Sequence, residues 1–280
     1  MRAASGLTGP LCILACENLQ RNSGELRRHT EALLSTKKDR EALLRGVHFC
    51  DTLVDRVCSG ISCVDGQVVV PVEKFHSWVV NEPRVRIKVL EALSKSKLIR
   101  LVNNLEFNSL EAQKYWCLNG AHLAAAAYAY NHNPNLMHFD DALAVPAIRG
   151  KVWALQEELG LALYLYAHRQ GLRSRFSEIV IVKYNRQVFQ RIKKNRTDTI
   201  ARVLKQEGAA VSGIVEVLNR MDRLLEPQGE ILAHRKGLEG LKYEAIALHA
   251  APHRKDRLEL DDAITQVIFA LRNFYANYSN

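Results

Sequence analysis

Lys114, Asn119 and His122 place an amine, an amide and an imidazole within nine residues of a segment whose flanks are typical of a helix. On an ideal α-helix, at about 100° per residue, Asn119 lies about 140° around the axis from Lys114, and His122 about 80°. The three side chains therefore share one broad face, which alanines continue for a further turn. An amine that exchanges a proton beside neutral hydrogen-bond donors suits proton transfer at a carbonyl or alcohol carbon.

Ordinary structural roles for the same three residues stay open at this point. A Lys on a helix is usually solvated, and a His in an Ala-rich stretch is usually a core residue. An Asn-Gly pair such as Asn119-Gly120 more often marks a helix end or a turn. Spacing alone does not decide between a catalytic cluster and a plain helix.

Composition is that of a soluble globular protein, with 48% apolar and 25% charged residues. A chain of 280 residues can form one large domain or two small ones. The formal charge of +9 raises the question of nucleic acid, but the basic residues are mostly mixed with acids. The densest basic run, residues 191–196, lacks interleaved aromatics and is expected to be a solvated helix face, with an anionic substrate or cofactor as the alternative. We expect no nucleic-acid partner.

The cysteines predict neither disulfides nor a metal site. Cys12 and Cys16 are four apart, with no second pair at zinc-ligand spacing, so we expect no metal and reduced thiols. The chain has no charged-then-apolar leader. The uncharged span 115–139 is long enough to cross a bilayer, but its Asn and His residues exclude a membrane helix. These features predict a cytoplasmic protein without a membrane partner.

The elements that would position the cluster are mostly helical. Apolar periodicity predicts helices over 24–47, 85–101, 105–130, 146–169, 177–193, 197–206, 211–225 and 261–275. Pro146 fits a first helical turn, and Gly171 follows the end of the same helix. Leu11–Cys16 reads as a buried strand, and the next clear candidate, 67–72, contains a proline. Because a buried strand needs neighbours, we expect its sheet in sequence upstream.

Several catalytic and cofactor motifs are absent from the sequence. It contains no G-x-G-x-x-G or G-x-x-x-x-G-K-[ST], so no dinucleotide or triphosphate cradle is predicted. It also contains no G-x-S-x-G elbow and no H-E-x-x-H zinc helix.

Four segments, in order, resemble the polyol-specific long-chain dehydrogenases. This family includes mannitol dehydrogenase, mannitol-1-phosphate 5-dehydrogenase, and the altronate and mannonate oxidoreductases. The segments are Ala15-Cys-Glu-Asn18-Leu, Phe49-Cys-Asp-Thr-Leu-Val-Asp55-Arg56-Val, a Trp-containing element over 72–80, and Lys114-x4-Asn119-x2-His122. The resemblance covers about residues 11–130, with a weaker likeness over 184–206.

The resemblance implies a division into two domains. Family members have an N-terminal Rossmann domain that binds NAD(P) and a mostly helical C-terminal domain that holds the substrate. Residues 1–22 would be the last strand and exit loop of a truncated Rossmann domain. Residues 23–280 would be a mainly α, multi-helical substrate domain like the C-terminal domain of 6-phosphogluconate dehydrogenase. The rest of the Rossmann domain is expected to be missing from this chain, in agreement with the strand argument above.

The resemblance also implies roles for single residues. Lys114 matches the general acid/base, whose pKa must be lowered towards working pH. Asn18 and Asn119 match the two amides that hold the reacting oxygen, which is oxyanion chemistry without a metal. His122 matches a residue that binds and orients the substrate hydroxyls.

Three further positions carry weaker implications. Asp55 and Arg56 match positions that could bind substrate, although an Asp–Arg pair that ties a turn to its domain explains them equally well. Glu17, beside Asn18, would either contact the cofactor or cap local structure.

Together these inferences predict an NAD(P)-dependent oxidoreductase acting on the CH–OH group of a polyol, polyol phosphate or sugar acid. We expect the chain to be inactive without a cofactor domain, supplied upstream or by a partner. The alternative is a non-catalytic helical binding or assembly module derived from the same family. The choice between NAD and NADP, the exact polyol, ketose or sugar acid, and the oligomeric state stay open.

Overall fold

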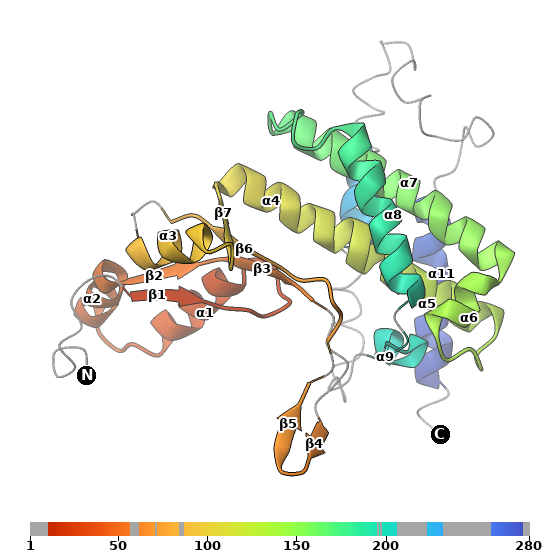
Figure 1. Ribbon diagram of the computed structural model, residues 1–280, viewed down its shortest axis with the longest axis horizontal. Coiled ribbons are helices and arrows are strands. Elements are labelled where there is room, and N and C mark those ends of the chain that lie inside the picture. The colour runs from red at the N-terminus through yellow and green to blue at the C-terminus, as the bar shows by residue number, and fades with distance from the viewer. Residues whose placement is uncertain are drawn as a thin grey trace. The chain divides into compact units, whose positions relative to one another are not determined.

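The structure, a computed structural model, describes residues 11–56, 62–70, 72–83, 87–194, 196, 198–205, 223–231 and 259–276 (Figure 1). The chain forms two compact units, residues 1–111 and 112–280, and each is described by itself.

The first unit begins with a βαβ arrangement. Its elements are β1 (Leu11–Leu14), α1 (Asn22–Ala32), α2 (Lys37–Gly46) and β2 (Val47–Cys50). β1 pairs in parallel with β2, from Leu11 opposite Val47 to Leu14 opposite Cys50 (Figure 1). A parallel pair needs a crossover of this kind, and the two helices supply it. The expectation that β1 would have no sheet partner in this chain is therefore wrong. β1 is also only partly buried, because Leu11 is exposed.

A second sheet follows, in the strand order β3-β6-β7. The remaining elements of the unit are β3 (Thr52–Asp55), β4 (Ser62–Val64), β5 (Gln67–Val69), β6 (Ser77–Asn81), α3 (Lys88–Lys95), β7 (Arg100–Val102) and α4 (Asn104–Ala112), which ends one residue into the second unit. Neighbouring residues of β6 pack into two different hydrophobic clusters. Val80 packs in a cluster with Leu90 of α3, whereas Val79 packs in another with Phe107 of α4. This alternation is that of a strand covered on both faces.

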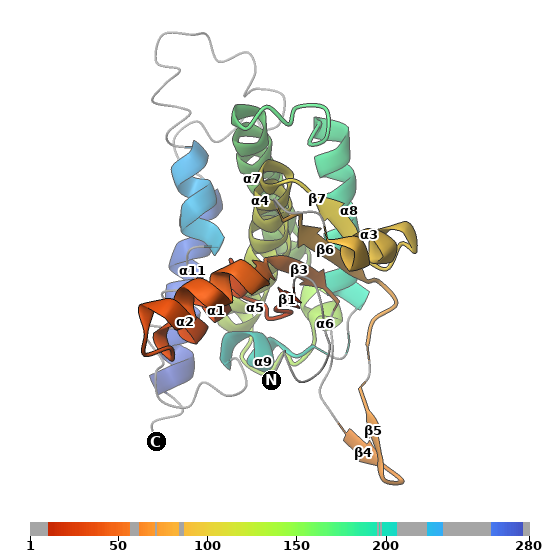
Figure 2. The ribbon, with the colours of Figure 1, turned by 90° about the vertical axis from the view of Figure 1, so that its left-hand side faces the viewer.

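The hairpin β4–β5 stands apart from the other strands of its unit in both views (Figures 1 and 2). Every residue of its two strands is exposed. Asp65 and Gly66 both have positive φ, as a two-residue hairpin turn requires. The mainly α character predicted for residues 23–280 holds only coarsely, because the described residues between Val47 and Val102 include six strands.

The described residues of the second unit form helices joined by turns, with one isolated β-bridge between His138 and Thr199. It contains η2 (Gln113–Gly120), α5 (Ala121–His132), α6 (Phe139–Ala144), α7 (Pro146–Arg169), α8 (Glu178–Lys194), α9 (Ile200–Lys205), a helix over 223–231 and α11 (Glu259–Ala276). α5 is central: it lies beside α11 in both views and also packs against α7 and α9 (Figures 1 and 2). Its residues 123–129 are all buried, and its alanines let neighbouring helices approach closely.

Most predicted helices are present, with instructive exceptions. The helix over 146–169 is confirmed at both ends, and Gly171 has the positive φ expected after a helix. The predicted helix 24–47 divides into α1 and α2, because the Thr36 hydroxyl caps the second helix by accepting from the Asp39 N–H at 3.1 Å. Among the described residues of the predicted helix 85–101, those that are helical are 88–95. Most of the helix predicted over 211–225 lies outside the described residues. In the described part of the chain, no helix is long and apolar enough to span a bilayer.

Candidate active site

Lys114 and Asn119 lie in η2, an eight-residue π-helix between α4 and α5. A π-helix bonds each residue to the one five positions away, and such segments occur frequently at functional sites. Lys114 and Asn119 are five residues apart, so π winding places them on neighbouring turns of one side. On an α-helix the same residues would be well separated around the axis. The winding therefore brings the amine and the amide together.

The candidate site combines burial with polar atoms that lack a hydrogen-bond partner. Lys114 is 8% exposed, which is rare for a lysine. Asn119 Nδ2 and His122 Nε2 are both buried, and neither has a hydrogen-bond partner among the described residues. Buried polar atoms are nearly always bonded, so Asn119 Nδ2 indicates a place that a ligand completes, whereas His122 Nε2 faces a carboxylate of the protein.

The His122 ring contacts one carboxylate and one aromatic ring. Its Nε2 lies 3.6 Å from Asp198 Oδ2, and its ring centroid lies 4.5 Å from that of Phe139. Burial lowers the pKa of His122 to about 4, against the opposing effect of Asp198. The imidazole is therefore neutral near pH 7, and it can orient hydroxyl groups as a hydrogen-bonding group rather than as a cation.

Three arginines that the sequence did not assign to the site act on His122. The positive charges of Arg202, Arg223 and Arg191 all lower its pKa. The Arg223 guanidinium lies 5.7 Å from the centre of the Tyr115 ring, and burial lowers the pKa of Arg223. Arg191 belongs to the run expected to be a solvated face, but it is half-buried, whereas the lysines that follow it are exposed. The i,i+4 spacing of Asp198 and Arg202 was the available sequence signal for part of this cluster.

The helix over 223–231 supports η2 directly. Trp116 Nε1 donates to Glu226 Oε2 at 2.8 Å, and the Trp116 ring meets Tyr166 edge-on at 5.4 Å. At the end of η2, a Cβ on Gly120 would lie 2.8 Å from the Arg223 carbonyl oxygen. Contacts this close fix the helical turn between Asn119 and His122.

The loop that carries Glu17 and Asn18 belongs to the first unit, and both residues are exposed there. Asn22, which is 3% exposed, holds this loop against β3. Its Nδ2 donates to the Glu17 carbonyl at 3.0 Å and to the Thr52 carbonyl at 2.9 Å, while its Oδ1 accepts from the Thr52 N–H at 3.1 Å. The sequence reading missed Asn22, although Asn next to a helix start is a common capping signal. The meeting of Asn18 with Lys114 stays a prediction.

Asp55 and Arg56 lie at the end of β3. Asp55 is buried, and Arg56 is exposed with its Nε donating to the Glu73 carbonyl at 3.2 Å. That bond ties two segments of the first unit, in line with the structural alternative for Arg56. A substrate-binding role for either residue stays a prediction.

The residues match known proteins along much of the chain. The family model for the mannitol dehydrogenase Rossmann domain matches residues 1–92. A curated mannitol-1-phosphate 5-dehydrogenase of Bacillus licheniformis is 32% identical over 151 residues. In these stretches the chain is similar to the mannitol dehydrogenase family. The aligned stretch is 54% of this chain and 37% of that relative.

Two solved structures share the fold of this chain. One is D-sorbitol dehydrogenase in substrate-free form, with a TM-score of 0.53 and 15% identity over 97% of this chain. The other is Pseudomonas fluorescens mannitol 2-dehydrogenase in a ternary complex with NAD and D-mannitol, with a TM-score of 0.53 and 14% identity over 100% of this chain. This chain spans 62% of each of those structures.

The Rossmann match of the family reaches well past the predicted domain boundary at residue 22. It includes β1, α1, α2 and β2, which form the parallel βαβ arrangement described above. The absence of the rest of a Rossmann domain is therefore not confirmed. The compact units likewise divide after Glu111 rather than after residue 22.

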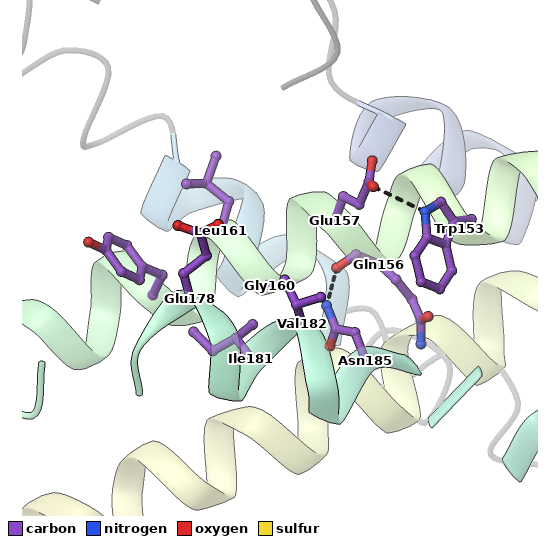
Figure 3. A pocket seen from close by; sticks show the side chains of 10 residues that line it. Trp153, Gln156, Glu157, Gly160, Leu161, Glu178, Ile181, Val182 and Asn185 are labelled. Atoms are coloured by element: carbon purple, nitrogen blue, oxygen red, sulfur yellow. Dashed lines mark hydrogen bonds between the residues drawn. The ribbon is translucent and has the colours of Figure 1, made fainter. Parts of the chain in front are cut away.

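A separate cavity lies between α7 and α8 (Figure 3). At its floor the Asn185 side chain lies between the two helices, with Nδ2 donating to the Gln156 carbonyl at 2.7 Å. Gly160 permits this close approach. Lys114, Asn119 and His122 do not line this cavity, so it is distinct from the candidate active site.

Proposed function

We propose that this chain supplies the substrate-binding and catalytic part of an NAD-dependent oxidoreductase that acts on the CH–OH group of a polyol, polyol phosphate or sugar acid. The observation that carries the proposal is the η2–α5 face, where a buried Lys114 accompanies the His122 imidazole and Asn119 Nδ2, which has no hydrogen-bond partner among the described residues. The family relatives named for mannitol, mannitol 1-phosphate and sorbitol support the substrate class.

In this mechanism Lys114 takes the proton from the substrate hydroxyl during oxidation and returns it during ketone reduction. Asn119 Nδ2 donates to the reacting oxygen and stabilises the negative charge that develops there. Asn18 is proposed to supply a second amide to the same oxygen. His122 binds a neighbouring hydroxyl. The chemistry needs no metal, because the amine moves the proton and the amides hold the charge.

When bound, NAD would supply the acceptor for the hydride of the carbinol carbon. The exposed loop after β1, with Glu17 and Asn18, fits the cofactor, because ligands of parallel sheets bind beyond the carboxyl ends of the strands. The division at residue 22 belongs to this proposal: the strand and loop before it end the cofactor domain, and the chain after it holds the substrate. Within that division, Asp55 and Arg56 are proposed to contact substrate.

Turnover and binding measurements test the proposal together. We expect the protein to form NADH or NADPH with a mannitol-type polyol, its phosphate or a sugar acid. The rate of this reaction should not fall when a metal chelator is added. Lys114→Ala should reduce turnover at least about 100-fold, the lower range for losing a general acid/base. The exposed Lys183 on α8 gives a control, and Lys183→Ala should keep wild-type turnover.

Two other outcomes would overturn the proposal. Turnover that survives Lys114→Ala would exclude the assigned general base. Saturable polyol binding without turnover with either cofactor would instead support the non-catalytic binding module.

A further inference from the structure

Asp198 is the carboxylate that faces the enclosed nitrogen of His122. The two atoms, His122 Nε2 and Asp198 Oδ2, lie 3.6 Å apart. This is just beyond hydrogen-bond length, and Nε2 has no hydrogen-bond partner. Hydrogen bonds in catalytic sites are often long without substrate and shorten when it binds.

The Asp198 carboxylate is held firmly in place. It is 1% exposed, and its other oxygen accepts from Arg202 Nε. Arg202 lies one helical turn further on, in α9, and its side chain is 38% exposed. The arginine therefore neutralises the carboxylate from one side and leaves Oδ2 directed at the imidazole.

The segment with Asp198 is also joined to the segment that carries Phe139, which contacts the His122 ring. Thr199 forms an antiparallel bridge with His138. The next residue, Phe139, is fully buried and lies against the imidazole. The two residues that contact the ring, Asp198 and Phe139, are thus each adjacent to a member of this bridge, an arrangement that restricts the rotation of the ring.

The charges around the ring favour a neutral imidazole with a defined tautomer. Arg202, Arg223 and Arg191 disfavour a proton on both nitrogens, and Asp198 is the negative group that opposes them. The neutral ring carries one hydrogen, and a carboxylate facing Nε2 favours its placement there.

We infer that Asp198 is a positioning residue that keeps the hydrogen of His122 on Nε2, so that Nδ1 presents its lone pair to a substrate hydroxyl. This inference rests on the proposed function, because it assigns His122 to a substrate hydroxyl. With a lone pair on Nδ1, the position beside His122 would bind a substrate group that donates a hydrogen bond. A hydroxyl is accepted there, whereas a carboxylate or a deoxy carbon is rejected.

The tautomer can be read directly in the intact protein by NMR of ¹⁵N-labelled histidine. The signal of His122 is assigned by its loss in His122→Gln. We expect hydrogen on Nε2, and hydrogen on Nδ1 would overturn the inference. Because this measurement needs no turnover, it tests the tautomer of His122 separately from the proposed activity.

Asp198→Asn supplies the functional test. The substitution keeps the shape but removes the charge, so we expect a mixture of tautomers and about a 10- to 100-fold loss of kcat/KM, the range for removing such a partner. The loss caused by deleting the substrate hydroxyl next to the reacting carbon should shrink in this variant. If Asp198→Asn keeps the wild-type tautomer and the same loss of activity with the deoxy substrate (the deoxy penalty), the inference is overturned, and the role of Asp198 is to pair with Arg202.

Two further variants show whether the effects of Asp198→Asn come from the lost charge or from a disturbed fold. Asp140 also pairs with an arginine, Arg196, at 2.7 Å, but it is not among the groups that act on His122. Asp140→Asn should keep both tautomer and deoxy penalty, and a change equal to that of Asp198→Asn would overturn the inference. If Asp198→Asn does not fold, Arg202→Lys keeps the carboxylate, and a changed tautomer in that variant would contradict the dominant role of Asp198.

Discussion

The Cβ position of Gly120 lies 2.8 Å from the backbone carbonyl oxygen of Arg223. Gly120 ends the π-helix, immediately after Asn119 and two residues before His122. The helix over 223–231 can approach this turn because position 120 has no side chain. The glycine thus sets the distance between the candidate site and the helix that carries Arg223.

Gly120→Ala is expected to destabilise the fold by about 1–3 kcal/mol, because the clash is with backbone and something must shift. Chemical denaturation of the purified variant measures the loss. Gly150 is the matched control: it is an exposed glycine within α7 with no atom within 4 Å of its Cβ position. Gly150→Ala should instead stabilise by about 0.5–1 kcal/mol. Equal effects at both positions would contradict the close approach.

Gly160→Ala tests the packing of α7 on α8. The new Cβ would lie 2.7 Å from Asn185 Nδ2 and 3.0 Å from Ile181 Cγ2. The Asn185 amide must move and lose its bond to the Gln156 carbonyl, at an expected cost of about 1–3 kcal/mol. In Gly160→Ala/Asn185→Ala the two losses should be less than additive. Strict additivity of the unfolding free energies would show that Asn185 does not cause the clash.

Asn22→Ala tests the loop that carries Asn18. The substitution leaves buried backbone groups of Thr52 without their partner, so we expect a loss of about 1–3 kcal/mol in unfolding free energy. Faster hydrogen exchange of the Thr52 amide should accompany it. Lys37→Ala, at a side chain that is 91% exposed, should leave both quantities unchanged. Unaltered exchange at Thr52 in Asn22→Ala would count against the anchoring role.

The burial of His122 predicts an acid-sensitive fold. In the unfolded chain its pKa is near 6.5, and burial lowers the folded pKa to about 4. Between these values the unfolded state binds the proton and the folded state does not. Stability therefore falls as pH decreases from 6.5 towards 4, by on the order of 2–3 kcal/mol.

Denaturation curves across that pH range check the prediction. His122→Gln should flatten the dependence, whatever its effect on stability at neutral pH. His29→Gln, at a side chain that is 69% exposed, should keep the wild-type slope. A wild-type slope in His122→Gln would assign the acid sensitivity to another group.

Local features of this protein follow from the sequence by itself. The Lys114–Asn119–His122 spacing, the helix from Pro146 to Arg169 and the strand at Leu11–Leu14 depend on neighbouring residues, so periodicity and end signals identify them. The order of the family motifs likewise depends on sequence alone.

Only the tertiary structure decided the remaining features, because they depend on contacts between distant residues. β1 has its partner in β2 across two helices, and the four-residue β2 is too short to show a pattern of its own. The helix over 223–231 reaches η2 through the bond from Trp116 to Glu226, which are 110 positions apart. Asp198 and Arg223 reach His122 from 76 and 101 positions along the chain. Since no local signal reports such contacts, the residues expected to perform the chemistry could be found in the sequence, whereas those that set their charge and orientation could not.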